Sequence, residues 1–299
     1  MATIGRTLTA PATVGAPTQA SRLLRDVPLV PTAILAVLVL AAVFAGVLAP
    51  YDPTLPIAGA RIFQPPFWMD GGTTNALLGT DFQGRDVLSR LIFGARVSLL
   101  VGVTGTVIAG GIGLVLGILA GYVGGWVDQA VMRLTDAWLA LPFLMFAIFL
   151  AALLGAGVWN IVIVFGLVYW TRYARVIRGE VLSLREREFV RLAQVAGVST
   201  PLIIVRHILP NVLNTWTVLA SLTVGVVIVT EASLSFLGVG VPPPTPAWGS
   251  MLSEARSTLM AGYWWLTIFP GVCISAVVLA ANLFGDWLRI RLDPQRRDL

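Results

Sequence analysis

Residues 97–123 read VSLLVGVTGTVIAGGIGLVLGILAGYV, a stretch without a single charged side chain. A helix needs about 20 predominantly apolar residues to cross the hydrocarbon core of a bilayer, and this stretch exceeds that length. Gly113, Gly117 and Gly121 recur in it at intervals of four. Small residues at that spacing share one helix face and let a second backbone approach closely. We therefore expect a membrane-spanning helix that packs tightly against a neighbour, with a pore-lining role for the glycines as the alternative.

Five further apolar runs lie at about 28–49, 134–154, 158–177, 212–230 and 263–288. Hydrophobic residues make up 57% of the chain and charged residues 12%, with a mean hydropathy of +0.86. Soluble domains carry about 25% charged residues, so these charges are too few to coat a soluble surface. The first run exceeds the roughly 7–15 apolar residues of a cleaved signal peptide. The sequence predicts an all-α polytopic membrane protein with about six transmembrane helices.

All 20 basic residues are arginines, and their distribution predicts an orientation. With the N-terminus inside, 15 arginines fall in segments on the inner side and 5 on the outer side. Inner loops are enriched in basic residues, so both termini are expected in the cytoplasm. The arginines then flank membrane helices, which argues against a nucleic-acid-binding face.

Several chemistries are excluded by what the sequence lacks. Without lysine the chain cannot form a phosphate-binding P-loop or a Schiff base. Its single cysteine, Cys273, and single histidine, His207, cannot build a Cys/His metal site. A membrane-embedded enzyme would need a catalytic cluster, and no HExxH, GxSxG or paired intramembrane Asp motif is present. An ion-driven secondary transporter would show inverted repeats or broken helices, and no clear repeat is visible.

Four ionisable residues lie inside or at the ends of predicted spans: Asp136, Arg172, Glu231 and Asp286. Such residues are expensive in hydrocarbon and are candidates for function by default. Long side chains near span ends can instead reach the headgroups. The four residues are therefore candidates for pathway or interface charges, with structural anchoring and proton coupling as the alternatives.

The polar block at 185–211 reads REREFVRLAQVAGVSTPLIIVRHILPN and predicts two short helices. The first covers about 186–196, and Gly197 follows it at a position that favours positive φ. Ser199 or Thr200 can cap the second helix, which is expected to end near Pro210.

Val190, Ala193 and Gly197 recur in this block at helical spacing and form an apolar stripe. A compact helix–glycine–helix unit at the membrane surface suits docking into a partner's groove. An ordinary interfacial loop is the alternative. His207 could contact such a partner or satisfy a local hydrogen bond.

This block resembles the cytoplasmic EAA loop of permease subunits in bacterial ABC importers. Gly197 and the Leu209-Pro210-Asn211 end match the family pattern, and Ala193 keeps the third residue of the EAA triplet. Arg191 and Leu192 depart from it. Four other segments, 78–102, 121–128, 231–252 and 269–294, are similar to dipeptide/oligopeptide importer permeases, specifically to the C-type partner of the permease pair.

The resemblance implies the ABC importer type I permease fold in the bacterial inner membrane. It implies four kinds of partner: a homologous sister permease, two ATP-binding cassette ATPase subunits, an extracytoplasmic solute-binding protein and membrane lipid. ATP and Mg²⁺ would be bound by the ATPases, so this chain would be non-catalytic and without a cofactor. Di- or oligopeptides are the expected substrate, with glutathione or nickel complexes as alternatives.

We expect a cytoplasmic tail at 1–27 and a first span with an extracytoplasmic segment at 28–96. Next we expect a core of five spans at 97–290, which contains the coupling loop at 185–211. A cytoplasmic tail at 291–299 follows the core. The candidate ATPase-coupling residues are Glu188, Arg191, Ala193, Gly197, His207, Pro210 and Asn211.

Overall fold

The computed structural model describes residues 27–292, whose regular elements are helices. Most of both expected tails, 1–27 and 291–299, lies outside this range. The helices are α2 (Leu29–Val43), α3 (Ala45–Leu48), α4 (Val87–Val123), α5 (Gly125–Leu139), α6 (Phe143–Leu154), α7 (Val158–Arg185), α8 (Glu188–Val195), α9 (Thr200–Ile203), α10 (Leu209–Phe236), α11 (Trp248–Ala255) and α12 (Trp265–Leu292), with a π-helical turn at Ile204–Ile208 and a 3₁₀ turn at Leu259–Ala261.

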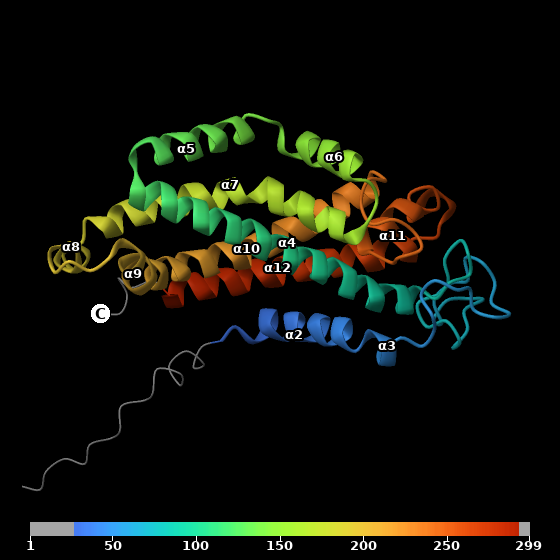
Figure 1. The fold of residues 1–299 in the computed structure, drawn as a ribbon. Helices are drawn as coiled ribbons and strands as arrows, with labels where there is room; N and C mark the ends of the chain where they lie inside the picture. The colour runs from blue at the N-terminus through green and yellow to red at the C-terminus, as the bar shows by residue number, and fades with distance from the viewer. Residues whose placement is uncertain (1–26, 293–299) are drawn as a thin grey trace, which may run out of the picture.

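Helices α4, α7, α10 and α12 form an elongated bundle (Figure 1). Helix α2 lies on one side of it, and α5 and α6 arch over the other side. One end of the bundle carries α8 and α9, while α3, the segment 50–86 and α11 occupy the opposite end. The start of α2 and the end of α12 both lie toward the α8 end.

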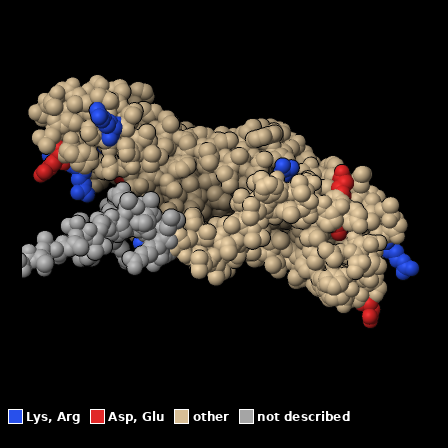
Figure 2. Space-filling view, turned by 90° about the horizontal axis from the view of Figure 1, so that it is seen from below, with Lys and Arg blue, Asp and Glu red and all other residues tan. Residues whose placement is uncertain are grey.

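Among the described residues, four helices are long and apolar enough to span a membrane: α4, α7, the continuous helix Thr200–Phe236, and α12. The pair α5–α6 passes the same test as a bent unit, and α2 is a shorter apolar helix. Charged side chains on one face gather toward the two ends of the molecule and leave a long uncharged stretch between them (Figure 2). This distribution matches a bilayer around the middle of the bundle.

Two of the expected spans differ in detail. The run at 134–154 is not one helix, because α5 and α6 meet at 93° across a short break. Pro142 is the N-cap of α6, and a residue that precedes proline is disfavoured in the helical conformation, so the helix ends before it. The first run is interrupted at Phe44, which leaves α2 with 15 residues and α3 with 4.

The expectation that the second helix of the 185–211 block ends near Pro210 is wrong. The chain remains helical from Thr200 to Phe236 and passes through Pro210 in the first turn of α10. Proline lacks an N–H and its ring crowds the preceding turn of a regular α-helix. The π-helical turn Ile204–Ile208 comes directly before it, and there the Leu209 N–H bonds the Ile204 carbonyl. The wider turn accommodates the proline without ending the helix.

Helices α4 and α7 make the tightest contact of the bundle, through Gly113, Gly117 and Gly121. A Cβ atom at Gly113 would lie 2.5 Å from the Trp170 carbonyl oxygen. A Cβ at Gly117 would lie 2.8 Å from the carbonyl oxygen of Ala174, and one at Gly121 would lie 2.9 Å from that of Arg178. The opposing atoms are backbone atoms, which cannot rotate away. Close backbone approach along this face is a main source of cohesion where lipid supplies no hydrophobic drive.

Candidate functional site

Gly197 ends α8 in a Schellman turn. Its φ is +77°, and no atom lies within 4 Å of where a Cβ would stand. The Val198 N–H bonds the Ala193 carbonyl at 3.1 Å, and the Gly197 N–H bonds the Gln194 carbonyl at 3.0 Å. Backbone conformation, and not crowding, is therefore the reason for glycine at this position.

The inner face of α8 is anchored to the bundle. Val190 is fully buried, in a cluster that includes Ile118 of α4 and Ile177 of α7. Ala193, one turn later on the same face, packs against that cluster. Gln194 adds a hydrogen bond to the Tyr122 hydroxyl at 3.3 Å. These contacts join α8 to the ends of α7 and α4.

The outer face of α8 carries large apolar side chains that are exposed in the described chain, Phe189 least so. Phe189, Leu192 and Val195 recur at intervals of three, which places them on one side of the helix. Their exposed fractions are 43%, 67% and 86%. We call these three residues the outer face of α8. An apolar surface at a water-exposed end is typical of a protein interface.

Charged side chains surround α8. The Arg191 guanidinium donates a hydrogen bond to the Glu186 carboxylate, and this bond lowers the pKa of Glu186. Glu188 lies in the first turn of α8, where its negative charge interacts favourably with the positive end of the helix dipole. Arg191, which departs from the family triplet, is thus an exposed ion-pair partner of Glu186, the residue that caps the C-terminus of α7.

His207 and Asn211 lie where the π-helical turn joins α10. The Asn211 side-chain amide donates to the His207 carbonyl at 2.6 Å. The His207 ring lies near the Phe189 ring, with 6.1 Å between centroids. His207 thus contacts α8 within the block, at a residue of its outer face.

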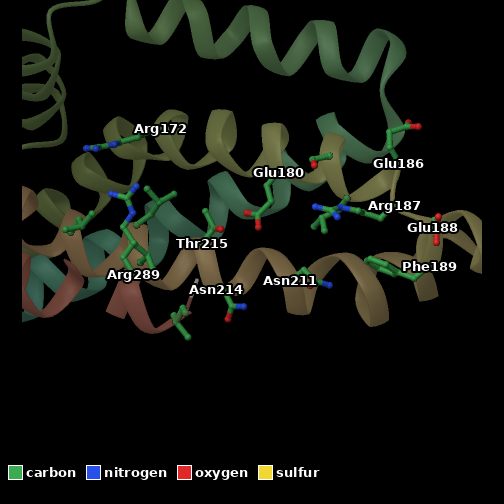
Figure 3. A pocket seen from close by; sticks show the side chains of 16 residues that line it. Arg172, Glu180, Glu186, Arg187, Glu188, Phe189, Asn211, Asn214, Thr215 and Arg289 are labelled. Carbon is green, nitrogen blue, oxygen red and sulfur yellow. The ribbon is translucent and has the colours of Figure 1, made fainter. Parts of the chain in front are cut away.

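A cavity of about 1140 Å³ opens beside this block (Figure 3). Helix α10 contributes one stripe of its wall, and α7, the start of α8 with the residues before it, and the end of α12 contribute the rest. Arg172 and Arg289 lie at one end, Glu180 and Thr215 lie further along, and Arg187, Glu188 and Phe189 lie at the α8 end. The cavity therefore reaches from the bundle to the coupling helix.

The remaining candidate charges do not form one cluster. Asp136 of α5 accepts a hydrogen bond from Arg175 at 2.6 Å, in an exposed pair. Asp286 is exposed on α12. Arg172 lines the cavity of Figure 3, as described above. The structure brings none of these three carboxylate and guanidinium groups into a shared proton path.

Glu231 is fully buried between α4 and α10. The Ser235 hydroxyl donates to its carboxyl group at 2.7 Å, and the Ser98 hydroxyl donates at 3.3 Å. Ser235 in turn accepts the Val241 N–H at 3.1 Å. Glu231 is thereby joined to the turn that follows α10, and its position indicates a role in fixing that turn.

A buried ion-pair cluster that the sequence did not predict lies at the opposite end of the bundle. Arg85 donates to Asp81 at 2.6 Å and to Glu254 at 2.9 Å. Arg90 donates to the same two carboxylates, at 2.7 Å for Glu254. Both arginine side chains are only 3% exposed. The cluster ties the segment 50–86 to α4 and α11, and only the density of charge in TDFQGRDVLSR hinted at it.

Known proteins similar to this chain are transport permeases. The chain is 42% identical to the di/tripeptide transport system permease protein DppC of Pseudomonas aeruginosa (strain UCBPP-PA14), over 87% of this chain and 86% of that protein. It is 38% identical to the glutathione transport system permease protein GsiD of Pectobacterium atrosepticum, over 86% and 83%. It is 39% identical to the dipeptide transport system permease protein DppC of Alkalihalophilus pseudofirmus, over 84% and 82%.

The profile of one protein family, described as binding-protein-dependent transport system inner membrane component, matches residues 113–298. That range covers more than half of the chain, including the glycine face of α4, α8 and the cavity of Figure 3. The chain therefore belongs to this family and is a non-catalytic, multi-pass inner-membrane permease subunit of an ABC importer.

Proposed function

We propose that this subunit forms half of a translocation pathway for di- or oligopeptides and receives the power stroke of an ATPase through α8. The observation that carries the coupling role is the contrast between the two faces of α8. Val190 anchors one face to the bundle, whereas Leu192 and Val195 are exposed on the other. A short helix held rigidly from behind, with an apolar front, suits insertion into a partner's groove.

The proposed motion begins when two ATPase subunits close on ATP and displace α8. Because the inner face of α8 packs on α4 and α7, the displacement passes to those helices directly. The Schellman turn at Gly197 passes it to Thr200–Phe236, which forms a wall of the cavity. The bundle then alternates between inward-open and outward-open states. Such coupling requires that the ATPase contact α8 differently in the two states.

The sister permease and the extracytoplasmic solute-binding protein complete the proposed assembly. Both chain termini would face the cytoplasm, which agrees with the end of α12 lying at the α8 end of the bundle and with the start of α2 pointing toward that end. The names of the DppC relatives favour di- or tripeptides as substrates. Glutathione, which is itself a modified tripeptide, is the second candidate because the GsiD relatives are nearly as similar.

Purification of the tagged chain from its native membrane in mild detergent tests the assembly. We expect mass spectrometry to identify a homologous permease and P-loop ATPases, with ATPase activity in the purified pool. Leu192→Asp should release the ATPases but keep the sister permease, because it places a charge on the outer face of α8. Leu77→Asp, at an exposed leucine of the opposite end, is the matched control and should retain both. Recovery of the chain alone in several mild detergents would contradict the proposal.

Gly197→Val tests the coupling turn itself. Valine disfavours positive φ, so the Schellman turn should distort while the bundle inserts normally. We expect uptake to be lost with unchanged protein levels in the membrane. Gly179→Val is the control, since that helical glycine of α7 also has no atom near its Cβ position and has no positive φ. Uptake at the wild-type rate in Gly197→Val would remove Gly197 from the mechanism.

A further inference from the structure

The cavity of Figure 3 separates positive from negative charge along its length. Arg172 of α7 and Arg289 of α12 lie at the end farther from α8. Glu180 of α7 lies two helical turns nearer to α8. One end therefore presents only positive charge, Glu180 lies further along, and the α8 end carries Arg187 together with Glu186 and Glu188.

The two arginines form no ion pair with a residue at 27–292, and Thr215 is a hydrogen-bond neighbour of the Glu180 carboxyl group. One carboxyl oxygen of Glu180, Oε2, is shielded from solvent and has no hydrogen-bond partner there. Buried polar atoms are normally satisfied, and Glu180 as a residue lines the cavity, so a donor there would satisfy the carboxyl group if the side chain turned toward it. Two arginines that line the same end of a cavity similarly favour an anion there.

The spacing of the charges corresponds to a short peptide. Arg172 and Glu180 are eight residues apart on α7, which is a rise of about 12 Å at 1.5 Å per residue. An extended chain covers about 3.3–3.6 Å per residue, so three residues extend over about 10–11 Å. Side chains that lean toward or away from each other widen the range to about two to four residues. Arginine also matches the planar geometry of a carboxylate.

We propose that this cavity holds a short zwitterionic peptide, with its carboxylate at Arg172 and Arg289 and its ammonium group at Glu180. The proposal rests on the proposed function and adds which residues read the substrate. Between the charged ends, the α10 wall offers Thr215, Val218 and Leu219, a mixed surface without charge. Only the peptide termini would then be recognised, and side chains of many kinds would be tolerated. The bound peptide would form and break ion pairs only.

The test uses the complete complex, co-purified through this chain and placed in nanodiscs without nucleotide and without solute-binding protein. Ligand-observed NMR then compares tri-alanine with its N-acetylated, C-amidated and doubly blocked forms. Omission of the solute-binding protein removes its own selectivity. We expect each blocked end to weaken binding about ten-fold, the loss expected for one charge-assisted interaction.

Two variants assign the ends. In Glu180→Gln, free and N-acetylated tri-alanine should bind equally, while discrimination against the amide persists. In Arg172→Gln, free and amidated tri-alanine should bind equally, while discrimination against the acetyl form persists. Asp286→Asn and Arg175→Gln are the controls, because these residues lie on the same helices and do not line the cavity. Both should keep the wild-type pattern.

Three results would overturn the proposal. All four peptides could bind equally to the wild type, or a cavity variant could weaken all four equally, as a purely structural role predicts. Alternatively, phosphatidylglycerol in the nanodisc could compete with the peptide at Arg172, which would make the arginines a lipid headgroup site. Co-purified ATPases and ATPase activity are recorded for every variant. An assembled, active complex that does not discriminate refutes only this inference, whereas absence of the partners refutes the proposed function.

Discussion

Replacement of Gly113 by alanine tests whether α4 and α7 are held together by backbone contact. The added Cβ would meet the Tyr173 Cβ, the Trp170 carbonyl oxygen at 2.5 Å and the Ala174 nitrogen at 2.9 Å. Two of these three atoms belong to the backbone of α7 and cannot move as a side chain can. The helices must therefore separate locally to admit one methyl group.

The magnitude follows from two opposing effects. Insertion of a methyl group into a tight interface costs about 1–3 kcal/mol, and rigid backbone neighbours favour the upper end. Alanine in place of glycine within a helix stabilises the helix by about 1 kcal/mol through its higher helix propensity. We expect Gly113→Ala to lower the free energy of unfolding by about 2 kcal/mol as the balance of these two effects.

Gly111→Ala supplies the matched control. Gly111 lies on the same helix, and no atom stands within 4 Å of its Cβ position. Gly111→Ala should be stabilised by the higher helix propensity of alanine and should cause no clash. The free energies of unfolding of the two variants should therefore differ by about 3 kcal/mol, which is the cost of overpacking alone. The measurement is unfolding of the purified chain in mixed micelles by titration with SDS, followed by tryptophan fluorescence. Equal SDS midpoints for the two variants would refute the packing argument and would favour the pore-lining role of the glycines.

Two further predictions concern the end of the bundle opposite α8. Glu231→Leu should raise the hydrogen-exchange rate of the Val241 amide about ten-fold, because Ser235 loses the carboxyl group that orients its hydroxyl. Glu231→Gln should leave that rate near the wild-type value. Equal exchange rates in the two variants would contradict the role of Glu231 in fixing the turn. Glu254→Gln should cost about 3–5 kcal/mol in the same SDS titration, because two buried arginines lose a carboxylate. The exposed Asp286→Asn should not shift the midpoint measurably, and an equal shift in both would contradict the buried cluster.

Long apolar runs and the glycine spacing were sufficient to predict an all-helical membrane protein, and the comparisons confirm the family. The pattern around Gly197 also located a helix C-terminus, since positive φ at a glycine after a helix is a local property. Features that depend on one segment are readable from that segment. The amphipathic stripe through Val190 and Ala193 belongs to the same class.

Features that depend on several segments were not readable. The break between α5 and α6 depends on Pro142, but hydropathy alone shows the two helices as one apolar run. Pro210 was expected to end a helix, and the π-helical turn before it removed the clash. The cluster around Arg85 and Arg90 draws Glu254 from a segment more than 160 residues away. No spacing rule connects charges that only the tertiary fold brings together.

The helix Thr200–Phe236 connects three features that otherwise look separate. At 37 residues it is about 55 Å long, nearly twice the thickness of the hydrocarbon core. It starts after the turn of α8, forms a wall of the cavity through Thr215 and Val218, and carries Glu231 near its far end. A rigid helix cannot move at one end alone, so a displacement of α8 must change either the cavity and the outer turn together or the helix itself. The π-helical turn Ile204–Ile208 lies between the start of this helix and its cavity-lining residues, which begin at Asn211, and such turns recur at functional sites. A bend at this turn would let α8 move without the cavity wall, whereas an unbent helix would carry both together.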